Sequence, residues 1–146
     1  MDDDTDAERV REYLDGHEFL SWLDIEPETV EPGRVVLSVP YGERLTNPAD
    51  EGEYVHSGVV STVADAASGF ALRTMLEDPR GTGVMTTNVN VSFLRPATDD
   101  VSVEAEVARA GGSVGVAEVT VTSGPRDGGR QTVATGTTTY RLFRPD

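Results

Sequence analysis

The chain has 146 residues, no cysteine, and 26 acidic against 12 basic residues, for a formal net charge of −14. A surface this acidic repels nucleic acid and anionic lipid, which excludes both as expected partners. The absence of cysteine removes disulfide and thiol chemistry. Every basic residue is arginine. Concentrated salt shortens the Debye length to about 3 Å at 1 M and screens the repulsion among these charges. We therefore expect a halophilic protein; the alternative is a merely acidic protein from a high-GC genome. The acidic start, MDDDTDAER, and the lack of an apolar run of membrane-spanning length favour the cytoplasm.

Residues 1–146 are predicted to form a single domain, with residues 1–6 disordered. Glu8 to Leu14 fits a short amphipathic helix that ends near Gly16. His17 follows on the apolar side of this segment, where a packed or solvent-tipped side chain is expected rather than a ligand. Segments 25–30 and 34–39 are predicted to be two strands joined at the turn pair Pro32-Gly33. Four later segments alternate apolar and polar residues with the period of a strand: 86–94, 101–108, 114–122 and 131–143.

A single long helix is predicted from Ser57 to Met75, in a segment rich in Ala, Gly, Ser and Val. Period-two alternation in the strands indicates an antiparallel sheet with one wet face and one covered face. Six strands and one long helix pack economically only if the sheet wraps the helix. The expected fold class is therefore α+β, with a curved antiparallel sheet around a central helix and a short N-terminal helix.

One carboxylate, Asp65, interrupts the apolar helix, where a buried and unpaired charge is costly. Arg73 lies eight positions on, about two turns away, so a direct ion pair within the helix is not expected. Nine residues separate His56 from Asp65, or roughly 13 Å along the axis at about 1.5 Å per residue. The two side chains cannot meet one reacting atom within a single chain. If both take part in chemistry, a second copy must bring its own Asp65 to this His56.

The segments HSGVVSTVADAA and TTNVNVSFLRPA resemble the PaaI-type acyl-CoA thioesterases of the hotdog fold, and the upstream FLSWLDIEPETVEPGRVVLSVP is similar to their N-terminal region. The resemblance covers residues 8 to 143. It implies hydrolysis of an aliphatic or aryl acyl-CoA to the free acid and CoA, by a homodimer or a dimer of dimers. Two features depart from the family pattern. Ser57 replaces a glycine, and the segment from Asn47 to His56 is a few residues longer.

The resemblance implies that Asp65 is the general base or the nucleophile, and that Thr86 places water beside it. His56 and Asn47 would orient the thioester carbonyl. A helix start offers unpaired N–H groups and the positive end of its dipole, which suits Ser57 and Gly58 to polarising that carbonyl. Each role has a structural alternative: a local hydrogen bond for His56, a common turn for Asn47-Pro48, and strand propensity for Thr86.

Coenzyme A is part of the expected substrate, and no separate cofactor is expected. Arg95, with Arg109 as a weaker candidate, would contact its phosphates, although a surface salt bridge explains either arginine equally well. Two histidines and no cysteine predict no metal site. The main alternative function is a non-catalytic acyl-CoA-binding hotdog domain. An enoyl-CoA hydratase would need a second histidine–acid pair, which this chain lacks.

Overall fold

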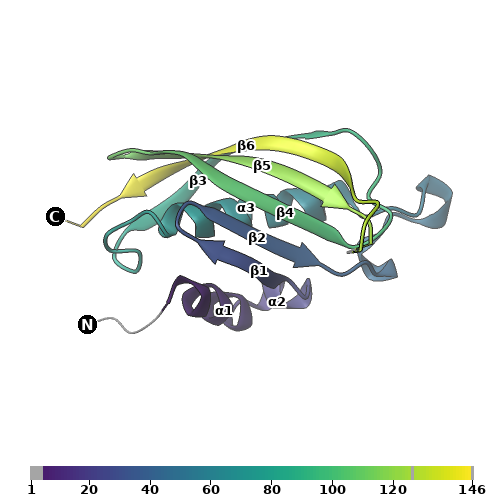
Figure 1. Ribbon diagram of the computed structural model, residues 1–146, viewed down its shortest axis with the longest axis horizontal. Helices are drawn as coiled ribbons and strands as arrows, with labels where there is room; N and C mark the ends of the chain where they lie inside the picture. Colours follow the sequence, from purple (N-terminus) through teal and green to yellow (C-terminus); the bar gives the residue numbers. More distant parts are fainter. Residues whose placement is uncertain (1–4, 126, 146) are drawn as a thin grey trace.

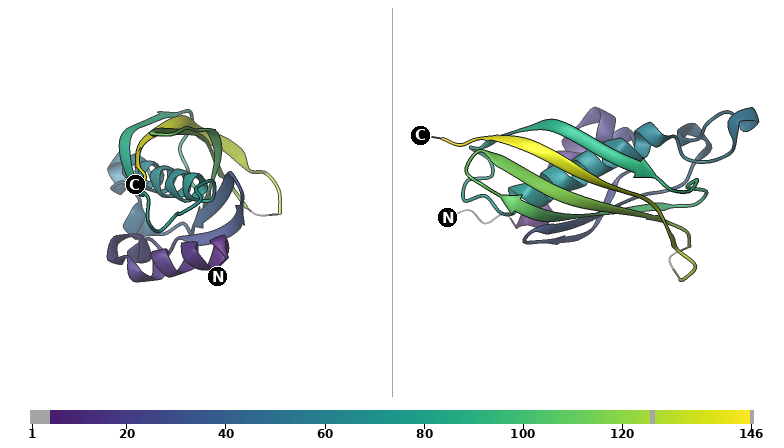
Figure 2. Two further views of the ribbon diagram at one scale, coloured as in Figure 1. Left: turned by 90° about the vertical axis from the view of Figure 1, so that its left-hand side faces the viewer. Right: turned by 90° about the horizontal axis from the view of Figure 1, so that it is seen from above.

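The computed structural model describes residues 5–125 and 127–145, and its centre is the helix α3, Ser57–Arg73. A six-stranded antiparallel sheet, in the order β1-β2-β4-β5-β6-β3, curls around this helix, as the end-on view of Figure 2 shows. The strands are β1 Glu26–Glu31, β2 Arg34–Val39, β3 Gly83–Phe93, β4 Val101–Ala110, β5 Val114–Ser123 and β6 Gln131–Phe143. The predicted architecture is confirmed.

Two short helices precede the sheet and lie beside β1 in Figure 1: α1, Asp6–Gly16, and α2, Glu18–Trp22. Thr5 caps α1 through a reciprocal capping box with Glu8, which satisfies two backbone N–H groups at the helix start. The prediction of disorder up to residue 6 is therefore wrong for Thr5 and Asp6, while residues 1–4 lie outside the described residues. The sequence did not predict α2, which begins where the His17 ring accepts a hydrogen bond from the Leu20 N–H, 3.2 Å away.

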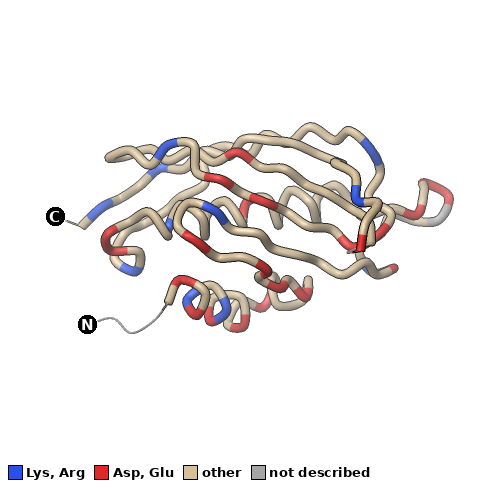
Figure 3. Tube along the Cα trace, viewed as in Figure 1, with Lys and Arg blue, Asp and Glu red and all other residues tan. Residues whose placement is uncertain are grey.

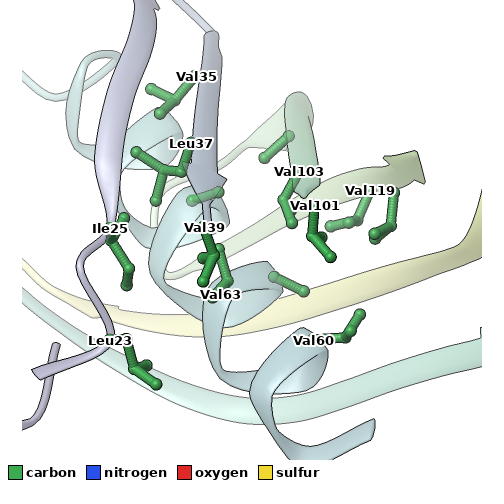
Figure 4. Close-up of a cluster of buried hydrophobic side chains, with 14 of the residues drawn as sticks. Leu23, Ile25, Val35, Leu37, Val39, Val60, Val63, Val101, Val103 and Val119 are labelled. Carbon is green, nitrogen blue, oxygen red and sulfur yellow. The ribbon is translucent and has the colours of Figure 1, made fainter. Parts of the chain in front are cut away.

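The core lies between α3 and the concave face of the sheet. Val60 and Val63 of α3 face buried valines and leucines of β2, β4 and β5 (Figure 4). The small residues Ala64 and Ala67 are fully buried. At Gly115 on β5 a Cβ would lie 2.5 Å from a Leu72 methyl. Small residues on both elements thus allow the close approach of strand and helix that the composition of α3 predicted.

Both faces of the edge strand β3 are largely exposed, unlike those of β2, β4, β5 and β6. Among the described strands its only partner is β6. Sequence alternation predicts one covered face, yet Val89 is 38% exposed and Phe93 is 47% exposed. No charged residue and no proline lies between Gly83 and Phe93. A long, uncharged edge strand is the kind of surface on which a further strand pairs.

The described helices include none that is both long enough and apolar enough to cross a membrane. The segment that connects β2 to α3 contains two turns of 3-10 helix, Glu43–Leu45 and Ala49–Glu51.

Acidic residues occur along most of the chain trace, including α1, β1, β4 and the loops (Figure 3). With a net charge of −14, we expect the melting temperature to rise by roughly 10 °C or more between about 0.1 M and 2 M KCl, because the Debye length falls from about 10 Å to below 3 Å. Thermal unfolding followed by circular dichroism in a KCl series measures this. A melting temperature that is independent of KCl would contradict the halophilic interpretation.

Candidate active site

His56 is the N-cap residue of α3, and its imidazole folds over the helix start. Its Nδ1 accepts a hydrogen bond from the Gly58 N–H at 2.8 Å. The proton of the neutral ring is thereby assigned to Nε2, which becomes an outward donor. A Cβ on Gly58 would lie 3.0 Å from Nδ1, so glycine at this position makes room for the ring.

The two backbone donors predicted at the helix start are not equivalent. The Gly58 N–H is occupied by His56, which removes it as a donor to a substrate in this conformation. The Ser57 N–H has no acceptor among the described residues, as expected for the first turn of a helix. Ser57 is exposed, so its N–H is the donor of the pair that a ligand can reach.

Asp65 lies two turns further along α3, half-buried, with one carboxylate oxygen held by two hydroxyl groups. Oδ1 accepts hydrogen bonds from Thr86 Oγ1 at 2.9 Å and from the Tyr140 hydroxyl at 2.8 Å. That hydroxyl also lies 2.9 Å from the Asp65 carbonyl oxygen, which can share its proton. Oδ2 has no partner among the described residues. The carboxylate is thus oriented through one oxygen and leaves the other for a water molecule or a substrate.

Sheet register explains why these two hydroxyls converge on one carboxylate. Thr86 on β3 is directly opposite Tyr140 on β6, and such a pair points to the same side of the sheet. The register shifts by one residue immediately after Thr86. Sequence analysis therefore paired Asp65 with Thr86 correctly in space, although their catalytic roles stay predictions.

Sequence analysis did not identify Tyr140 as a site residue. Alternation in β6 places Thr138, Tyr140 and Leu142 on the buried face, and a tyrosine hydroxyl there needs a partner. This need of a buried hydroxyl for a hydrogen-bond partner was the signal that the sequence offered. Only the register between β3 and β6 shows that the partner is Asp65. Tyr140 is 1% exposed. Burial, and then the negative charge of Asp65, raise the pKa of its hydroxyl well above the ordinary value, so it stays a hydrogen-bond donor.

Tyr140 should therefore ionise later than a free tyrosine. Subtracting the ultraviolet titration of Tyr140→Phe from that of the native protein should reveal a tyrosinate that forms only above about pH 11. Because the raised pKa means that the folded state holds this proton more tightly, its contribution to stability is complete below about pH 10 and falls as the pH rises further. A difference curve centred near pH 10 would contradict the buried Tyr140–Asp65 contact.

Within one chain, His56 and Asp65 do not share a site. Both belong to one continuous helix, as predicted, with His56 at its cap and Asp65 in its interior. A cleft of about 450 Å³ opens at Asp65, and Thr86 and Tyr140 line it, but His56 does not. Each chain thus carries two separate groups of polar atoms: a helix start with hydrogen-bond donors, and a carboxylate whose Oδ2 has no partner among the described residues.

Asn47 lies beside the helix start despite the long segment that separates it from His56 in the sequence. The segment folds back on itself, with Thr46 bridging Val55. The His56 N–H donates to the Leu45 carbonyl at 2.8 Å, and the Asn47 N–H donates to the Tyr54 carbonyl at 3.1 Å. The additional residues form the tip of this loop and do not displace Asn47 from His56.

The two predicted phosphate-binding arginines lie at opposite ends of α3. The Val55 N–H donates to the Ala97 carbonyl at 2.9 Å, which places the segment of Arg95 beside the helix start. Arg109 pairs with Val116 at the far end of β4, next to the strand that contacts Leu72. Both arginines are exposed, and neither has a carboxylate partner among the described residues. Only Arg95 is close to the helix start of its own chain.

Comparison with known proteins assigns the family. The model of the thioesterase superfamily matches residues 52–129, which is more than half of the chain. The chain belongs to the thioesterase superfamily. The matched residues include the helix start, Asp65 and Thr86.

Individual proteins and structures that are similar to this chain agree with this assignment. A protein of Halobacterium salinarum that bears the name "Putative esterase" is 39% identical over 148 residues, covering 100% of this chain and 98% of the relative. The crystal structure of a thioesterase family protein from Silicibacter pomeroyi matches with a TM-score of 0.85 and 33% identity, over 97% of this chain and 100% of that one. A thioesterase from Haemophilus influenzae, at 19% identity and a TM-score of 0.80 over 94% of this chain and 90% of its own, shows the same hotdog fold.

Proposed function

We propose that the protein is a PaaI-like acyl-CoA thioesterase. The observation that carries this proposal is the Asp65 carboxylate, which is half-buried at a cleft, oriented by two hydroxyls through Oδ1, and free at Oδ2. A carboxylate that is oriented through one oxygen and open to a cleft through the other can position a water molecule and take a proton from it. Because the chain belongs to the thioesterase superfamily, the bond that this carboxylate would help to cleave is a thioester.

The site as proposed combines these two groups of polar atoms from two chains. The thioester carbonyl accepts hydrogen bonds from the Ser57 N–H and from Nε2–H of His56, at the positive end of the α3 dipole. The partner subunit's Asp65 then takes a proton from water through Oδ2, and the water oxygen attacks the carbonyl carbon. When the C–S bond breaks, the free acid forms and CoA leaves as its thiol after taking up the proton. In the alternative route, Asp65 attacks first and water hydrolyses the resulting anhydride.

The second chain docks along β3 in this proposal. The strand is a free edge, has no charged residue, and exposes apolar side chains that alternation assigns to a covered face. In a chain with a net charge of −14, an uncharged surface is where two copies can approach with the least repulsion. Antiparallel pairing of two β3 strands forms a two-fold dimer, and two such dimers can form a tetramer.

The acyl-CoA part of the proposal comes from the resemblance to PaaI-type thioesterases and from Arg95. This arginine is exposed, lies beside the helix start and has no carboxylate partner among the described residues. Its cation can offset the repulsion between the acidic surface and the phosphates of CoA.

The alternative is a domain that binds acyl-CoA without hydrolysing it. The test is release of free CoA thiol from short-chain, medium-chain and aryl acyl-CoAs in molar KCl, with binding measured in parallel by calorimetry. Turnover supports the proposal. Binding without turnover would overturn it in favour of the non-catalytic domain.

A further inference from the structure

The cleft at Asp65 continues along α3 beyond the proposed reaction centre. Asp65, Gly69 and Arg73 all line it, and residues spaced by four lie in one row along a helix. Tyr13, His17 and Phe70 line the cleft as well, and they also line the neighbouring cleft beneath α1. The Tyr13 ring meets Phe70 edge-on, with centroids 5.3 Å apart. These aromatic residues form a wall at the Arg73 end of the row.

The guanidinium of Arg73 points back along this row. Its Nη1 lies 3.5 Å from the position that a Cβ on Gly69 would occupy, which places the charge over Gly69. A long helical side chain leans in this direction, toward the N-terminus of its helix. Because Gly69 has no side chain, the space between Asp65 and the guanidinium stays open. The separation from Asp65 to Gly69 along the axis is about 6 Å, at about 1.5 Å per residue.

Arg73 carries a charge that no described carboxylate balances. The Arg73 side chain is half-buried and forms no ion pair among the described residues. Its guanidinium carbon lies 6.0 Å from the centre of the Tyr13 ring, at the limit of a cation–π interaction. The other two arginines of the neighbouring cleft are paired: Arg9 with Asp6, and Arg80 with Glu12. In a chain with 26 acidic residues, an unpaired and partly desolvated arginine is unexpected unless an anion binds there.

His17 adds a second donor at the same end of the cleft. Its Nδ1 accepts the Leu20 N–H at 3.2 Å, which assigns the proton of the neutral ring to Nε2. The ring stacks on Tyr13 with centroids 5.7 Å apart. The far end of the cleft thus combines a guanidinium, an imidazole N–H and an aromatic face.

We propose that Arg73 binds a carboxylate at the far end of the acyl group, so that the preferred substrate is the CoA monothioester of a short dicarboxylic acid. This inference rests on the proposed function, because it takes Asp65 as the reaction centre. The axial rise of about 6 Å from Asp65 to Gly69, over which the guanidinium lies, corresponds to roughly four or five carbon–carbon bonds of about 1.5 Å each, because the bonds of an extended chain zigzag. Glutaryl-CoA and adipoyl-CoA have this length, and Arg73 is a specificity-determining residue in this scheme.

The test compares two acyl groups of equal length that differ only at the far end: glutaryl-CoA, with a carboxylate, and pentanoyl-CoA, with a methyl group. Native protein should hydrolyse glutaryl-CoA with a kcat/KM at least tenfold higher. Arg73→Gln should lower kcat/KM for glutaryl-CoA tenfold or more and change that for pentanoyl-CoA less than twofold. Arg73→Lys should retain part of the preference, because it keeps the charge but loses the bidentate geometry.

The matched control is Arg11→Gln, which removes an arginine of α1 that pairs with Glu26 of β1 and lines neither of the two clefts. This substitution should change kcat/KM for neither substrate. An equal loss of kcat/KM for both substrates in Arg73→Gln would overturn the inference. It would indicate that Arg73 binds CoA phosphates or maintains the fold. Equal kcat/KM for the two substrates in the native protein would also overturn it. Both results would leave the proposed function standing, whereas only a failure to hydrolyse these two substrates and the medium-chain and aryl acyl-CoAs as well would contradict the function itself.

Discussion

Replacing Asp65 with asparagine should lower kcat for acyl-CoA hydrolysis by about 10³-fold, because the amide can neither accept a proton from water nor attack the carbonyl. The substitution keeps the shape of the side chain. Its amide oxygen can still accept the hydrogen bonds from Thr86 and Tyr140 that the structure shows at Oδ1. We therefore expect the protein to fold and to bind acyl-CoA, with loss of activity confined to kcat. Steady-state kinetics of thiol release, together with thermal unfolding, measure both properties.

The control for this substitution is Asp15→Asn, which makes the same chemical change at an exposed position on α1 and should leave kcat unchanged. Near-native turnover in Asp65→Asn would contradict the assigned role. A single turnover of native protein in oxygen-18 water, followed by mass spectrometry of Asp65, distinguishes the two routes. In that single turnover, the nucleophilic route places the label in the Asp65 carboxylate, because water attacks the aspartyl carbon of the anhydride, whereas the general-base route places it only in the product acid.

Mixing two inactive variants should restore activity if the site is shared between chains. A dimer of one His56→Ala subunit and one Asp65→Asn subunit contains one site with both native groups and one site with neither. Random assortment makes half of the dimers mixed, so about 25% of native activity should return under two-fold symmetry. The physical reason is the separation of His56 and Asp65 on one continuous helix, which places them in different sites of the same chain.

This experiment is done by unfolding and refolding the two variants together and assaying them beside each variant refolded alone. A chain with both substitutions, refolded with native protein, is the control, because its mixed dimers then contain no site with two native groups. The absence of restored activity, despite mixed dimers detected by mass spectrometry, would show that each chain holds a complete site. The proposed arrangement across β3 would then be wrong.

The secondary structure was largely predictable, because it depends on local patterns. Period-two alternation identified the last four strands, and the turn pair Pro32-Gly33 between two apolar segments identified the first two. The run of small residues identified α3 to within two residues of its end at Arg73. The start of α1 and the whole of α2 were missed. Both depend on side chains that satisfy backbone N–H groups: Thr5 for α1 and His17 for α2. Such caps involve one or two residues and leave no periodic signal.

The site was predictable only in part, for a related reason. Asp65 stands out in the sequence because a carboxylate interrupts an apolar helix, and the position of His56 before a glycine marks the helix start. Tyr140 could not be connected to Asp65, since 75 positions separate them in the chain. The register between β3 and β6 brings them together, and register is a property of strand pairing rather than of either strand.

The sequence by itself determined the antiparallel sheet around one helix, the acidic surface, and the distance that keeps His56 away from its own Asp65. These follow from periodicity, composition and the rise of a helix, which are local quantities. Only the tertiary structure decided that Tyr140 and Thr86 hold one oxygen of Asp65, that the Gly58 N–H is already occupied, and that Arg73 lies over Gly69 with no carboxylate partner among the described residues. The contacts of Asp65 depend on strand register, which no single segment encodes, and the positions of the His56 and Arg73 side chains depend on rotamers that residue spacing alone does not fix.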